Sequence, residues 1–178
     1  GKATGIELSN GEHIVAETVV SNAGAKATYF DLIGKENVSS EVTGQVERHR
    51  TKSIAFKINL ACNALPRWTA YDERRLNEAN PGSITLAENS EELEDAFHTA
   101  QNGEMSKHPY LWITTPSAFD GSVAPEGKHV VQIMGGHVPY KLNGREWNDQ
   151  TRQELLDIVL RQICRYAPGF DKEVLHAQ

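Results

Sequence analysis

The residue types that most often carry out chemistry occur singly in this sequence. Its seven histidines show no H-x-x-x-H or H-E-x-x-H spacing and its two cysteines form no C-x-x-C pair, so we expect no metal site. A nucleophile elbow, G-x-S-x-G, and a phosphate-binding P-loop are also absent. We therefore predict no catalytic residue that acts without a further part of the protein, and an isolated chain without activity.

Three side chains with nucleophilic atoms have structural interpretations. We interpret Ser117, which follows Thr115 and Pro116, as a loop hydroxyl that satisfies a turn. Cys62 comes just after an apolar strand and Cys164 lies on a helix, so both are predicted to be buried thiols that pack as small hydrophobic side chains. Two cysteines make no disulfide framework, which favours a reducing, cytoplasmic location.

Two features of the predicted strands are suited to lining a pocket. Lys57 and Asn59 project from the strand face opposite to the apolar residues of segment 53–61. Such a polar face lines a pocket or faces solvent, and solvent is the commoner case. The pair Gly135-Gly136 either lets the backbone approach a ligand or marks a bulge or bend, and we favour the bulge or bend.

Hydrophobic periodicity predicts the strands and helices that position these candidate residues. A hairpin opens the chain, since apolar and polar residues alternate on both sides of Asn10-Gly11. The other strands are expected at 17–22, 53–61, 83–86, 110–115 and 129–134, and the helices at 25–33, 39–50, 90–102 and 149–166. Adjacent strands with short joins and clustered helices predict an α+β fold with a mixed, largely antiparallel sheet.

Composition limits the possible functions. The chain has 178 residues, 39% hydrophobic and 24% charged, which is typical of a soluble globular protein. Its net charge of -6 argues against nucleic acid as a partner, because phosphate backbones require a basic face. Its apolar runs are far shorter than the roughly 20 residues of a transmembrane segment. The sequence begins at Gly1 without a methionine, so we expect a piece of a longer protein.

Several short sequence segments occur in the same order as in one family of enzymes and resemble it. They are Thr-Val-Val-Ser-Asn-Ala at 18–23, Thr-Tyr-Phe-Asp-Leu-Ile-Gly at 28–34, Phe-Lys-Ile-Asn-Leu-Ala at 56–61, Thr-Pro-Ser at 115–117, Ala-Pro-Glu-Gly-Lys-His-Val at 124–130 and Tyr-Ala-Pro-Gly-Phe at 166–170. The sequence resembles the middle to C-terminal part of phytoene-dehydrogenase-related, FAD-dependent oxidoreductases. Within this family the sequence resembles the branch of the pyridine nucleotide-disulphide oxidoreductase domain-containing proteins, relatives of the carotenoid desaturases and retinol saturase.

The resemblance implies an architecture like that of the amine oxidases. In such enzymes one domain holds FAD, and a second domain of mixed sheet and helices covers the flavin and forms the substrate cavity. The family's G-x-G-x-x-G fingerprint and its second glycine-rich FAD stretch are absent here. The resemblance therefore implies that residues 1–24 are strands at the edge of the FAD domain and that residues 25–178 are a substrate-domain segment. FAD is expected in the intact protein, with none bound to this chain.

The resemblance also suggests site residues, position by position. The strand end that lies beside the flavin in the family matches three candidate cofactor contacts: Ser21, Asn22 and Ala23. Segments around the family's substrate cavity match four candidate substrate contacts: Lys57, Asn59, Thr115 and Ser117. The expected partners are the missing FAD-binding domain of the same polypeptide and an apolar or amphiphilic small-molecule substrate.

The resemblance implies hydride transfer between that substrate and FAD, in which the flavin does the redox chemistry and the protein supplies orientation and a dry cavity. A stand-alone, non-enzymatic α+β module that binds an apolar ligand or a protein partner is the alternative. An exposed apolar sheet face would suit a missing domain, whereas a closed, lined cavity would favour the binding module. An enzyme with its own site would require convergent polar groups with shifted pKa values in one cleft.

Overall fold

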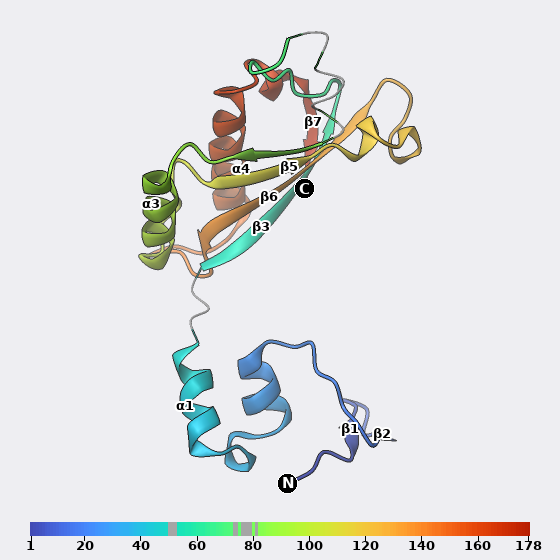
Figure 1. Cartoon of the computed structure of the whole chain (residues 1–178), viewed down its shortest axis with the longest axis vertical. Helices are drawn as coiled ribbons and strands as arrows, with labels where there is room; N and C mark the ends of the chain where they lie inside the picture. The colour runs from blue at the N-terminus through green and yellow to red at the C-terminus, as the bar shows by residue number, and fades with distance from the viewer. Residues whose placement is uncertain (50–52, 73–74, 76–79, 81) are drawn as a thin grey trace. The chain divides into compact units, whose positions relative to one another are not determined.

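The computed structural model describes residues 1–49, 53–72, 75, 80 and 82–178 of the chain. The chain divides into two compact units, Gly1–Arg50 and Thr51–Gln178 (Figure 1). Each unit is described by itself. The assignment of residues 1–24 to the edge of an FAD domain stays a prediction.

The first unit opens with the predicted hairpin. Strands β1 (Gly5–Glu7) and β2 (His13–Val15) pair in antiparallel register. The turn holds because the Asn10 side chain accepts the Glu12 amide at 3.0 Å, and Gly11 adopts φ +84°. Asn-Gly therefore forms the turn that the sequence predicts.

Helical segments complete the first unit. They are a π-helical turn (Ala27–Leu32), a 3-10 turn (Lys35–Asn37) and helix α1 (Ser40–Arg48). The prediction of a strand at 17–22 was wrong, because no described strand pairs with these residues. Val20 is 88% exposed, and among the described hydrophobic residues of this unit Val46 alone is buried. The unit thus has little core of its own.

The second unit is built on a five-stranded sheet with the order β4-β5-β6-β3-β7, in which all neighbours are antiparallel. The strands are β3 (Ser53–Cys62), β4 (Ser83–Leu86), β5 (Tyr110–Thr114), β6 (His129–Pro139) and β7 (Val174–Ala177). The α+β class is confirmed. Sequence periodicity missed β7, which is short and half exposed, and it ended β6 five residues too early, at residue 134.

Two longer helices join this sheet: α3 (Ser90–Gln101) and α4 (Asp149–Cys164). Asn89 caps α3, since its side chain accepts the Glu92 amide at 2.8 Å. A capping box starts α4: the Asn148 side chain accepts the Thr151 amide at 3.0 Å, and the Thr151 hydroxyl accepts the Asn148 amide at 2.8 Å. Both caps fix where the helices begin.

The core lies between α4 and one face of the sheet (Figure 1). Even-numbered residues of β3 enter it, because successive side chains of a strand point to opposite faces. The buried members from the sheet and from α4 include Ile58, Leu60, Leu111, Ile113, Val131, Ile133, Leu155, Ile158, Val159 and Ile163. We call this side of the sheet the covered face and the opposite side the open face.

Candidate functional site

The open face carries Lys57 and Asn59, two of the residues that the sequence suggested. Both are exposed, and both lie on the face of β3 opposite to Ile58. Cross-strand register pairs Lys57 with Met134 of β6, and Met134 in turn with Trp112 of β5. One row across the sheet therefore begins at an ammonium group and continues over two large apolar side chains.

The apolar part of this row is unusually accessible for side chains of its size. Trp112 and Met134 are each 45% exposed. The indole Nε1–H of Trp112 donates to the Ser83 hydroxyl of the neighbouring strand, which limits the rotation of the ring. Neighbouring strands are about 4.8 Å apart, so the row from Lys57 to Trp112 spans on the order of 10 Å.

The charge of this row comes from Lys57. Its ammonium has no ion-pair partner among the described residues, and its neighbours Asn59 and Gln132 on the same face are uncharged. An unpaired cation beside apolar surface suits a molecule with an apolar body and a polar or anionic end.

The hydroxyls of Thr115 and Ser117 both bond to backbone groups. The Thr115 side chain is 5% exposed, and its hydroxyl donates to the backbone carbonyl of Asn80. The Ser117 hydroxyl accepts the backbone amide of Val130 at 2.9 Å, with His129 Nδ1 at 3.4 Å. No described hydrogen bond joins either side chain to Lys57 or Asn59, and the role of these four residues as substrate contacts stays a prediction.

Ser21, Asn22 and Ala23 lie in an exposed loop of the first unit. The Ser21 hydroxyl shares a hydrogen bond with that of Thr28 at 2.8 Å and accepts the Ala23 amide at 3.3 Å. The described residues include no buried polar side-chain atom left unpaired that would await a ligand. By themselves these exposed residues form no enclosed site for a flavin, and their role as flavin contacts in the intact protein stays a prediction.

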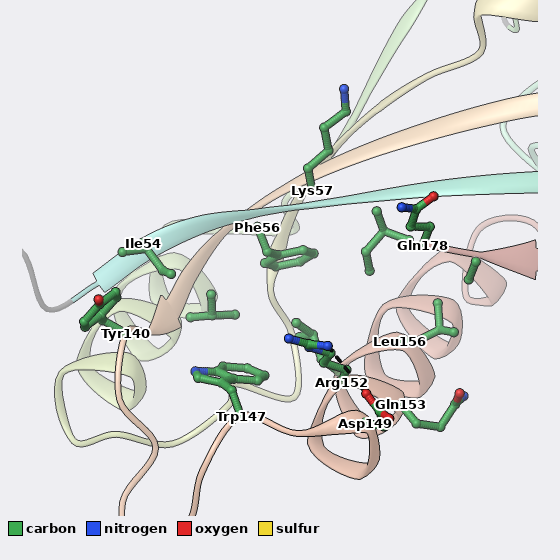
Figure 2. Close-up of a pocket in the computed structure, with 14 residues that line it drawn as sticks. Ile54, Phe56, Lys57, Tyr140, Trp147, Asp149, Arg152, Gln153, Leu156 and Gln178 are labelled. Atoms are coloured by element: carbon green, nitrogen blue, oxygen red, sulfur yellow. Dashed lines mark hydrogen bonds and ion pairs between the residues drawn. The ribbon is translucent and has the colours of Figure 1, made fainter. Parts of the chain in front are cut away.

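A pocket that the sequence did not predict lies on the covered face (Figure 2). Its volume is about 660 Å³, and it is bounded by the strand β3, the end of β6 and the first turns of α4. Phe56 and Trp147 are its large aromatic walls, and aliphatic residues line the space between them: Ile54, Ile58, Val138, Leu155 and Leu156. Lys57 belongs to the lining as well, but its side chain points to the other side of β3.

The shape of the pocket depends on Gly135. A Cβ atom there would lie 2.0 Å from Cζ of Phe56, so a side chain at this position would displace the ring. Beyond it β6 is bulged: Phe56 pairs with Gly135, yet Ile54 pairs with Val138. His137 takes φ +63° within this bulge. The favoured interpretation of the Gly135-Gly136 pair as a bulge is therefore confirmed, and this glycine pair is the sequence signal that hints at the pocket.

The described groups supply little reactive chemistry. Burial raises the pKa of the Cys62 thiol to about 11, and the Glu173 carboxylate acts in the same direction. The thiol is thus a poor nucleophile at neutral pH. Among the described residues no group of three or more His, Cys, Asp or Glu side chains is placed to hold a metal ion. No helix in the described part of the chain is long and apolar enough to span a bilayer.

Comparison with known proteins gives relatives that include a pyridine nucleotide-disulfide oxidoreductase domain-containing protein, phytoene desaturases and prolycopene isomerases. The chain is 32% identical over 180 residues to mouse pyridine nucleotide-disulfide oxidoreductase domain-containing protein 2, covering 98% of this chain and 31% of that protein. It is 30% identical over 140 residues to a phytoene desaturase of Fusarium fujikuroi, covering 78% of this chain and 22% of the desaturase. The chain thus spans less than a third of the length of either relative. No protein-family model matches it.

A solved structure shares the fold. An oxidoreductase from Methanosarcina mazei superposes with a TM-score of 0.58 at 19% identity, over 99% of this chain and 33% of that one. At this identity the likeness concerns the fold. The sequence relatives and the shared fold agree with the resemblance that the sequence phrases indicated.

Proposed function

Because the chain is homologous to a segment of pyridine nucleotide-disulfide oxidoreductase domain-containing protein 2 and of the phytoene desaturases, we propose that it is the substrate-covering segment of an FAD-dependent oxidoreductase. Its substrate is apolar or amphiphilic, and the open face of the sheet forms one wall of the reaction cavity. The flavin is held by another part of the polypeptide, since Ser21, Asn22 and Ala23 alone do not form a site for it.

One observation carries this proposal: the open face exposes Trp112 and Met134 side by side, while α4 covers the other face. Large apolar side chains of a finished sheet are normally covered, and a contiguous exposed group marks a contact with another protein part or with a ligand. A flavin domain and an apolar substrate would cover them here. The pocket on the covered face is open to solvent rather than enclosed, which gives the stand-alone binding module less support.

The residues of this chain have defined tasks under the proposal. When bound, FAD would supply the redox chemistry. Trp112 and Met134 exclude water and hold the apolar body of the substrate by contact. Lys57 attracts a polar or anionic end of the substrate at the edge of this row, and Asn59 offers it a hydrogen bond. No residue of this chain is assigned a proton-transfer step.

The first test concerns the 178-residue chain alone. Its absorption spectrum should lack the flavin band near about 450 nm, because the flavin's contacts come from elsewhere. Stoichiometric flavin in the purified chain would contradict our proposal that another part of the polypeptide binds the flavin.

The second test uses the longer polypeptide that contains this segment, with phytoene in liposomes as the probe. Anaerobic bleaching of the flavin band would report hydride transfer. Trp112→Ala and Met134→Ala should slow bleaching by about tenfold through lost apolar contact, with flavin content unchanged. Arg161→Ala, a truncation of an exposed residue of α4 on the other side of the sheet, is the control. If flavin bleaching were equally fast in all three variants, the open face would not be a wall of the reaction cavity.

A further inference from the structure

The pocket on the covered face is a separate feature from the open face. Its residues come from β3, β6, β7 and α4 and from the segment before α4, all within the second unit. Phe56 points into it, whereas Lys57, the next residue of the strand, points to the opposite side of the sheet (Figure 2). A ligand here would therefore not occupy the proposed reaction cavity.

The two aromatic walls, Phe56 and Trp147, are held in place by separate contacts. Phe56 rests over Gly135, where the absence of a side chain leaves room for its ring. The indole Nε1–H of Trp147 donates to the carbonyl of Pro139 at 3.2 Å, which fixes the orientation of that ring. Both rings are therefore in place before a ligand arrives, which lowers the entropic cost of binding.

Polarity is graded from the interior to the mouth. Between the rings the lining is aliphatic, with Val138 and Leu155 buried and Leu156 half-buried. Charge is found at the entrance, where Arg152 and Asp149 lie 3.5 Å apart with side chains 71% and 102% exposed. The interior therefore favours an uncharged body, and the entrance tolerates a polar substituent in water.

We propose that this pocket binds a flat, uncharged ring compound, with its apolar rings against Phe56 and Trp147 and any polar substituent at the mouth beside Arg152. The volume of about 660 Å³ lies within the range of roughly 300–1,000 Å³ that small-molecule sites occupy. Aromatic walls favour planar ligands through stacked or edge-to-face contacts. The site is a second one, and it stands whether or not the open face belongs to an oxidoreductase cavity.

The test uses N-phenyl-1-naphthylamine, a neutral ring compound whose emission rises in apolar surroundings, with the 178-residue chain. We expect saturable binding, with energy transfer from tryptophan that falls more in Trp147→Phe than in Trp112→Phe, while the buried Trp68 remains a donor in both variants. A larger loss in Trp112→Phe than in Trp147→Phe would place the probe on the open face and overturn the proposal.

Matched variants distinguish binding in the pocket from non-specific binding of the probe to other apolar surface. Leu156→Gln places an unpaired amide in the lining, and we expect binding to weaken by about tenfold. Met134→Gln makes the same kind of change on the open face and should leave the dissociation constant unchanged. Ala177→Leu, which fills space at the pocket wall, gives a second measurement if Leu156→Gln fails to fold. Equal affinities of the wild type and a folded pocket variant would overturn the proposal, as would absence of binding to the wild type.

Discussion

The ring of Phe56 occupies the space that a side chain of Gly135 would fill. These two residues face each other across β3 and β6, and a Cβ atom on Gly135 would lie 2.0 Å from Cζ of the ring. One glycine thereby allows an aromatic side chain to lie flat on the neighbouring strand and to form a wall of the pocket. The relationship depends on close approach and not on backbone conformation, since Gly135 has no positive φ.

Gly135→Ala should therefore destabilise the protein and reshape the pocket. The new methyl group must push Phe56 off its strand, and overpacking of this kind costs about 1–3 kcal/mol. Urea denaturation would measure the change. Gly136→Ala is the control, because a Cβ there would meet Tyr110 Cδ1 at an ordinary 3.7 Å. If the two variants were equally stable, Phe56 would not depend on the space above Gly135.

The two faces of β6 should differ sharply in their contribution to stability. Ile133 is fully buried under α4, whereas its neighbour Met134 is 45% exposed on the open face. Ile133→Ala should lower the free energy of unfolding by about 2–5 kcal/mol, because it leaves a cavity. Met134→Ala should cost less than about 1 kcal/mol. Chemical denaturation of both variants would test the assignment of the faces, and similar losses would refute it.

Removal of the cap of α4 should weaken the helix that lines the pocket. Asn148→Ala removes the oxygen that accepts the Thr151 amide, and such a loss costs about 1 kcal/mol. Asn148→Asp keeps an acceptor at this position and should retain most of the stability. The midpoint of urea unfolding distinguishes the two. A wild-type midpoint for the alanine variant would show that the cap contributes nothing measurable.

Stability should fall at alkaline pH through Cys62. Burial raises the pKa of its thiol from 9.0 to about 11, so the unfolded chain loses this proton at a lower pH than the folded one. The contribution is complete below pH 9 and is lost as pH rises towards about 11, at up to about 1.4 kcal/mol per pH unit. Cys62→Ala should show a correspondingly shallower decline of the unfolding free energy over this window. Parallel pH profiles for the two proteins would contradict the assignment.

Local sequence determined the elements whose signals are contiguous. Alternation along β3 predicted its two faces and, to within one residue, its extent, and Asn10-Gly11 predicted a turn. These signals are readable because strand periodicity and turn formation act between residues a few positions apart. The α+β class and the resemblance to the oxidoreductase family followed from the same kind of local information.

Tertiary structure decided which surfaces are covered and which chemistry they offer. Residues 17–22 have the composition of a strand but lack a described partner, while the short β7 forms because β3 offers it an edge. Sequence alternation assigned Lys57 and Phe56 to opposite faces, but only the packing of α4 made one face a pocket and left the other open. Register and helix docking join residues far apart in the chain, so no local pattern contains them.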